Sequence, residues 1–133
     1  MICIVGECNA DRLLGDFELI KTDYADISAD SAAVIVGKNA RLTVRAALGI
    51  IVEEDFTLNF PRGIQLITCG ISPKNTVSVT SRTDERLTLS LNRGIRAKHG
   101  LCEPLEFPVD TRPDMSEFDL MAAFAARLLV GGD

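Results

Sequence analysis

Basic side chains in the middle of the chain are the residues whose types and spacing best suit a binding site. Residues 70–100 contain six basic and two acidic side chains, whereas the segments before and after them are net acidic. Within VSVTSRTDERLTLSL, a period of two places two arginines on a polar strand face together with serine and threonine hydroxyls. The residues predicted to bind a small anion or an acidic protein surface are Lys74, Arg82, Arg86, Arg96 and Lys98. A solvated strand face with no ligand would show the same pattern.

A second kind of chemistry would use Cys8 or the loop Gly70–Asn75. Cys8 follows a predicted strand and precedes a short helical turn, a position where a thiolate can be stabilised, but no histidine accompanies it in the sequence. The loop joins two predicted strands, and turn chemistry accounts for its Gly70 and Pro73. If these residues are functional, the protein is a small enzyme or a nucleotide- or anion-binding protein. This is the alternative to a non-catalytic binding module. No catalytic residue is assigned.

The sequence predicts neither a metal site nor a cofactor. His99 is the only histidine, and it lies in a Lys-His-Gly turn typical of exposed residues. The spacing of Cys3 and Cys8 is too wide for a zinc or redox pair. The stretch GECNADRLLG lacks the spacing of a phosphate-binding loop, and the acidic run Glu53–Asp55 is typical of a hydrated loop.

Composition limits the remaining classes of protein. The 133 residues, 47% hydrophobic and 25% charged, predict one globular domain over residues 1–133. A formal net charge of -5 argues against nucleic-acid binding, and no apolar run approaches the ~20 residues of a membrane span. Because the chain begins directly with strand-like MICIVG, we expect no leader peptide, four free cysteines and a cytoplasmic location.

The elements expected in residues 1–70 form the parallel part of an α/β fold. The predicted buried strands are Ile2–Val5, Phe17–Ile20, Ala32–Val36 and Ile64–Cys69. The polar segment Asp23–Ser31 is predicted to be a linker. Residues 42–52 combine helix-favouring alanines with strand-favouring β-branched residues, so both structures stay open, with a helix over Ala40–Gly49 preferred.

Residues 71–110 are predicted to form an antiparallel meander, and residues 114–131 a helix. Two alternating strands flank the polar turn Arg82–Glu85, and a third strand contains Pro108, which favours a sheet edge. Ser116 or Asp114 caps a helix that Gly131-Gly132 ends. Apolar residues nearly encircle this helix, so either two layers of its own domain or a second subunit must cover it, and a homodimer is one expectation.

The series LITCGIS, VSVTS, LEFPV and FDLMAAFAARLLVG, over roughly Leu66–Gly131, resembles the closing part of the central domain of the Mur ligase family. These ATP-dependent amide ligases have a similar strand, a small antiparallel sheet and an alanine-rich helix there. The phosphate loop of the family is missing, and Met115 and Ser116 occupy the positions of its His-Asn pair. A further family asparagine corresponds to Asp119. The resemblance therefore implies the fold without the ligase machinery.

Together these patterns predict an α/β fold in which a Rossmann-like parallel sheet is followed by a small antiparallel β-meander and a buried C-terminal helix. The predicted function is a non-catalytic interaction or ligand-binding module.

Overall fold

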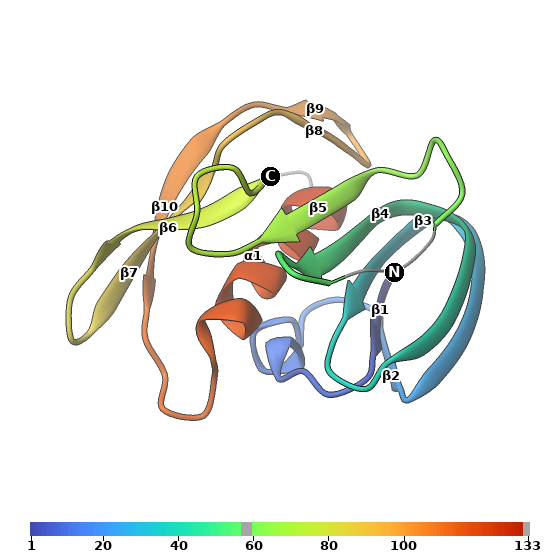
Figure 1. Cartoon of the computed structure of the whole chain (residues 1–133), viewed down its shortest axis with the longest axis horizontal. Helices are drawn as coiled ribbons and strands as arrows, with labels where there is room; N and C mark the ends of the chain where they lie inside the picture. The colour runs from blue at the N-terminus through green and yellow to red at the C-terminus, as the bar shows by residue number, and fades with distance from the viewer. Residues whose placement is uncertain (57–59, 132–133) are drawn as a thin grey trace.

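The computed structural model describes residues 1–56 and 60–131, and ten of the twelve elements in this part of the chain are β-strands (Figure 1). The elements are β1 (Ile2–Val5), the 3-10 helix η1 (Ala10–Leu13), β2 (Leu19–Thr22), β3 (Tyr24–Val36), β4 (Arg41–Glu53), β5 (Leu66–Cys69), β6 (Val77–Arg82), β7 (Arg86–Leu91), β8 (Ile95–Ala97), β9 (Gly100–Cys102), β10 (Leu105–Asp110) and α1 (Glu117–Gly131).

The predicted Rossmann-like α/β fold is wrong, because eight of the ten strands form one mixed sheet that coils in the manner of a β-solenoid. The order of its eight strands is β10-β7-β6-β5-β4-β3-β1-β2, and β1 to β5 pair in parallel. Only residues 37–40 connect β3 to the start of its parallel neighbour β4. A Rossmann crossover needs a dozen or more residues and a helix. This connection is short enough only because β3 itself curves round, as the concentric arcs in Figure 1 show.

Two expectations about the long strands are also wrong. Asp23–Ser31, the predicted linker, supplies most of the first half of β3, where Ala25, Ile27 and Ala29 are less exposed than the polar residues between them. The segment Ala40–Gly49, for which a helix was preferred, lies in β4 from Arg41 onward. In both segments a period of two was present, but acidic residues in one and alanines in the other obscured it. Register shifts after Ile27 and Ala29 mark the places where the β3–β4 ladder is interrupted.

The sheet separates two apolar cores. Ile2 and Ile4 of β1 contribute to the core that faces α1, whereas Cys3 and Val5 contribute to a second core on the opposite side of β1. Leu129 from α1 is fully buried in the first core. The prediction that Ile2–Val5 is a strand buried on both faces is therefore confirmed, although among residues 1–56 and 60–131 no helix covers the second face. The curved strands β3 and β4 supply the side chains that cover it.

The antiparallel elements agree with their sequence patterns. β6 and β7 pair as the predicted hairpin, and β10 pairs with β7 at the edge of the sheet, as Pro108 indicated. An additional hairpin, β8–β9, surrounds the predicted turn Lys98–Gly100. Its Lys98 N–H donates to Leu129 O of α1 at 2.8 Å, so this hairpin is fixed against the helix.

The C-terminal helix is confirmed, and most of its cover comes from the chain itself. α1 lies within the curve of the strands (Figure 1) and contacts β3, β4, β5, β6, β8 and η1. Most of its apolar surface is therefore buried within its own domain, and the homodimer stays a prediction. Of the two predicted caps, Ser116 accepts a hydrogen bond from Asp119 N–H at 3.1 Å. Gly132 lies outside the described residues. No helix within residues 1–56 and 60–131 is long and apolar enough to cross a membrane.

Candidate functional site

The two arginines at the tip of the β6–β7 hairpin are engaged within the molecule. Arg82 donates to both carboxylate oxygens of Glu117 at 2.8 and 2.7 Å, and this guanidinium holds the pKa of Glu117 below its usual value. Arg86 pairs with Asp110 at 3.2 Å. These ion pairs offset the positive charge that the sequence assigned to a ligand.

The other predicted basic residues do not join the arginines in one patch. Lys74 lies in the loop before β6, and the length of β6 separates it from Arg82 by about 17 Å or more. Arg96 and Lys98 lie on β8 and in the turn that follows it. Lys74, Arg96 and Lys98 make no ion pair among the described residues. Anion binding by the five residues stays a prediction.

The Gly70–Asn75 loop is held by a network of amide and hydroxyl groups. Asn75 is 5% exposed and donates to Glu54 Oε2 at 3.0 Å and to Ser72 O at 2.9 Å. The amide of Asn92 donates to Asn75 O at 3.0 Å and to Ser78 Oγ at 2.9 Å. These contacts give the loop a structural role, since the side-chain amides of Asn75 and Asn92 are hydrogen-bonded within the chain.

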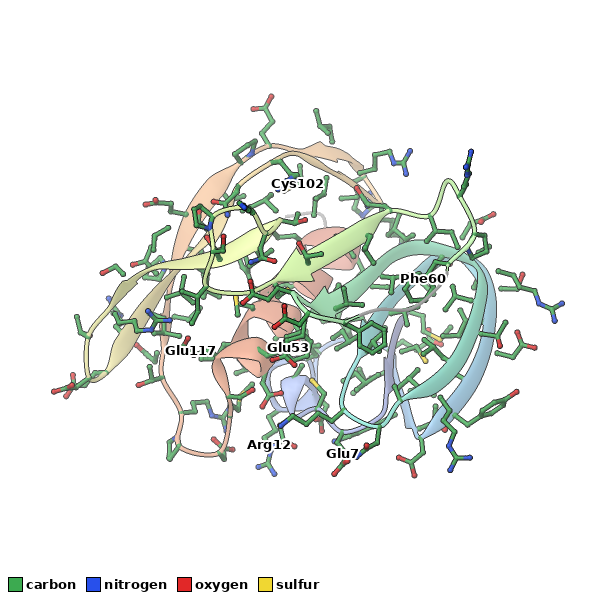
Figure 2. The ribbon with its side chains drawn as sticks, viewed as in Figure 1. Glu7, Arg12, Glu53, Phe60, Cys102 and Glu117 are labelled. Carbon is green, nitrogen blue, oxygen red and sulfur yellow. The ribbon has the colours of Figure 1, made fainter. Side chains whose placement is uncertain are left out.

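An acidic cleft lies where the parallel strands end and α1 begins. Its volume is about 300 Å³, and its lining includes Glu7, Glu53 and Glu117, which are labelled in Figure 2. Glu54, Asp119 and one basic residue, Lys38, also line it. No group of three or more carboxylate, thiol or imidazole side chains in the described part of the chain is arranged to hold a metal ion.

Asp119 fixes the inner wall of this cleft. Its Oδ2 accepts from Ser116 N–H at 2.9 Å, which completes a reciprocal capping box with Ser116. Its Oδ1 accepts from Asn9 N–H at 3.1 Å and from the Cys8 thiol at 3.3 Å. The carboxylate, 6% exposed, thus connects the start of α1 to the loop after β1, and all of these contacts are structural.

The Cys8 thiol is in an environment that disfavours a nucleophile. Burial, with a smaller contribution from the hydrogen bond to Asp119, raises the pKa of Cys8 to about 12. A reactive cysteine requires the opposite shift, because the thiolate is the attacking species. All four cysteines are free; Cys3, Cys8 and Cys69 are buried, whereas Cys102 is partly exposed.

This difference predicts the order of cysteine modification. In the folded protein at pH 8, we expect N-ethylmaleimide to modify Cys102 first and Cys8 only on unfolding. The raised pKa leaves about a thousandfold less Cys8 thiolate than an ordinary thiol would have. Peptide mass spectrometry after timed labelling, with a denatured sample as the control, measures the order. Cys8 labelling as fast as Cys102 labelling would support the enzyme alternative.

An apolar groove runs between α1 and the hairpin and edge strand that precede it in the chain. One pocket of about 380 Å³ is lined by Leu101, Leu105, Phe107, Phe124 and Leu128, with Cys102, labelled in Figure 2, on its β9 side. Leu101 is 69% exposed and Phe107 is 50% exposed. Large apolar side chains this exposed and this close together are uncommon on the surface of an isolated domain.

A second pocket continues the groove beyond a pair of phenylalanines. The rings of Phe107 and Phe124 stack with centroids 5.9 Å apart and separate the first pocket from one of about 360 Å³. Leu13, Val109 and Leu120 are among the residues that line this second pocket. Arg127, which borders both pockets, is bound to Asp16 through two hydrogen bonds of 3.0 Å. The groove therefore has an apolar floor and a charge-balanced rim.

Sequence reasoning did not find this groove. The alternation of Leu105, Phe107 and Val109 predicts one apolar face of an edge strand, but it does not show that this face lines a groove beside α1. The signal that could have found it is the edge position of β10 together with a helix apolar on nearly all sides, which the strands cannot cover completely.

Comparisons of the chain with protein-family models, with curated proteins and with solved structures found no match. The resemblance to the Mur ligase family accordingly stays a prediction from the sequence.

Proposed function

We propose that the protein is a non-catalytic interaction module of the cytoplasm, and that the groove between α1 and β8–β10 binds an extended segment of a partner protein. The segment would place one apolar side chain in each of the two pockets. The observation that carries this proposal is the pair of apolar pockets separated by the Phe107–Phe124 stack, with the exposed Leu101 at the rim. Exposed aromatic and aliphatic side chains around a pocket are typical of the centre of a protein interface.

The charges around the groove agree with an apolar rather than an ionic partner. Each arginine at or next to the groove forms an ion pair within the chain. These pairs are Arg127–Asp16, Arg112–Asp114 and Arg86–Asp110. Because these side chains already have partners, a segment bound in the groove gains its affinity mainly from the burial of apolar surface, at roughly 25 cal/mol per Å².

Leu101 gives the sharpest test, because its exposure allows a change without loss of core packing. The probes are acetylated hexapeptides with two leucines or two phenylalanines separated by one to three residues, and alanine versions serve as negative peptides. Titration followed by backbone amide NMR is expected to shift signals from β8–β10 and α1. We expect Leu101→Asp to weaken binding about tenfold, since one interface anchor is replaced by a charge that must be desolvated.

Ile71→Asp is the matched control. Ile71 is 62% exposed and lies in the loop after β5, outside the groove, so this variant should bind as the unmodified protein does. Equal binding by Leu101→Asp and the unmodified protein would contradict the proposal. So would amide shifts that map to the acidic cleft around Glu53 and Asp119.

A further inference from the structure

The two edges of the eight-stranded sheet differ in how they are protected. At one edge, Thr111 N–H donates to Glu85 O at 2.9 Å, so the backbone groups of the odd-numbered residues of β10 face β7. By alternation, the backbone of Pro108 faces away from the sheet. Its missing N–H makes that edge a poor template for another strand. The other edge is β2, which contains neither proline nor glycine, and no strand of the described sheet lies beyond it.

Backbone hydrogen bonds determine which groups of β2 point outward. Ile2 N–H donates to Glu18 O, and Gly6 N–H donates to Thr22 O, both at 2.9 Å. The even-numbered residues around β2 therefore face β1. By alternation, the N–H and C=O groups of Leu19 and Lys21 point away from the sheet, where they can pair with another strand.

We propose that a second copy of this chain pairs with β2 through a two-fold axis, which extends the sheet antiparallel across the interface. The two outward-facing residues determine the register. Leu19 lies opposite Lys21 of the second copy, and Lys21 opposite Leu19, so that four backbone hydrogen bonds form. Ile20 then lies on the axis, directly opposite Ile20 of the second copy. When the two-fold axis is perpendicular to the sheet, side chains that lie on one face in the first copy lie on the same face in the second copy. The register with Ile20 opposite Ile20 is compatible with such an axis.

The side chains of β2 suit this pairing. Ile20 is 47% exposed, and its self-contact buries apolar surface at the centre of the interface. Glu18 lies opposite Thr22 of the second copy, so no like charges are directly opposed on this face. The charge of Lys21 is already offset by Asp11, whose carboxylate is 3.2 Å from its amine. Self-complementarity of this short stretch selects a second copy over an unrelated strand.

The length of β2 determines how strong the association is. A strand of four residues makes a contact below the size of a stable interface, which buries roughly 1,200–2,000 Å². The dimer should therefore form reversibly and depend on concentration. It uses a surface other than the apolar groove, so its test is independent of the proposed function.

Sedimentation equilibrium over a range of concentrations up to millimolar tests the dimer. The unmodified protein should approach twice the monomer mass as concentration rises. Ile20→Lys places two ammonium groups on the axis and should remain monomeric, as should Ile20→Glu. Mixing the two variants should restore a 1:1 dimer, because opposite charges then meet at position 20. Ile71→Lys, the same change at another exposed isoleucine, should dimerise like the unmodified protein.

Hydrogen exchange measured by NMR separates strand pairing from other association. The amides of Leu19 and Lys21 should exchange more slowly at high concentration, and those of Glu106 and Asp110 on β10 should not change. A monomeric unmodified protein at every concentration would overturn the inference. A dimer that persists in both Ile20 variants, or a mixture of them that stays monomeric, would overturn it as well.

Discussion

Gly6→Ala is expected to destabilise the protein by about 3–5 kcal/mol and to lower its Tm by roughly 10 °C or more. Gly6 has a φ of +86°, a conformation that alanine adopts only with strain. A Cβ atom there would also lie 2.6 Å from Lys38 O and 2.9 Å from Ala40 Cα. Both atoms belong to the backbone of the short β3–β4 connection, which is bound to Glu7 through two backbone hydrogen bonds and cannot move aside easily. Thermal and urea denaturation measure the loss.

Two further glycine variants make this prediction specific. Gly37→Ala should be similarly damaging, because its Cβ atom would lie 2.4 Å from Glu7 O, at the same contact between the loop after β1 and the β3–β4 connection. Gly15→Ala is the matched control, because in the described part of the chain no heavy atom other than those of its own neighbours in sequence lies within 4 Å of its Cβ position. Its free energy of unfolding should change by less than about 0.5 kcal/mol. A Gly6→Ala protein as stable as Gly15→Ala would mean that the loop after β1 does not pack against the β3–β4 connection as closely as described.

Asp119→Ala should reduce the free energy of unfolding by about 2–4 kcal/mol. The substitution removes a buried carboxylate that accepts from Ser116 N–H, Asn9 N–H and the Cys8 thiol. These donors would be left without their partner at the junction of α1 and the β1 loop. Urea denaturation of the variant and the unmodified protein measures the difference.

Ser116→Ala separates helix capping from the tertiary contact. It removes only the hydroxyl that accepts from Asp119 N–H, so about 1 kcal/mol should be lost. Asp119→Asn keeps one acceptor oxygen and should fall between the two. If Asp119→Ala costs no more than Ser116→Ala, the contacts to Cys8 and Asn9 do not contribute to stability.

Local patterns predicted the antiparallel elements well. The hairpin of β6 and β7, the edge strand with Pro108, and the helix capped by Ser116 each depend on residues close in sequence. Turn residues, helix caps and a period of two are properties of short segments. They can therefore be recognised in one sequence without knowledge of the fold.

The candidate sites were less predictable because they depend on contacts between distant segments. Arg82 was assigned to a ligand, but its partner Glu117 lies 35 positions away in the sequence. The apolar groove combines Leu101 and Phe107 with Phe124 of α1, and no local pattern distinguishes a groove residue from a core residue. Cys8 received its raised pKa from burial and from Asp119, which the sequence places 111 residues away.

Local sequence patterns were enough to locate most of the strands and the start of the helix. How the parallel strands connect became clear only from the three-dimensional fold. Parallel strands in a sequence suggest helical crossovers, but β3 curves and only residues 37–40 lead from it to β4. The positive φ of Gly6 and the missing side chain of Gly37 let the loop after β1 pack directly against this connection. Such a contact depends on backbone atoms meeting in space, and it leaves no periodic trace in the order of the side chains.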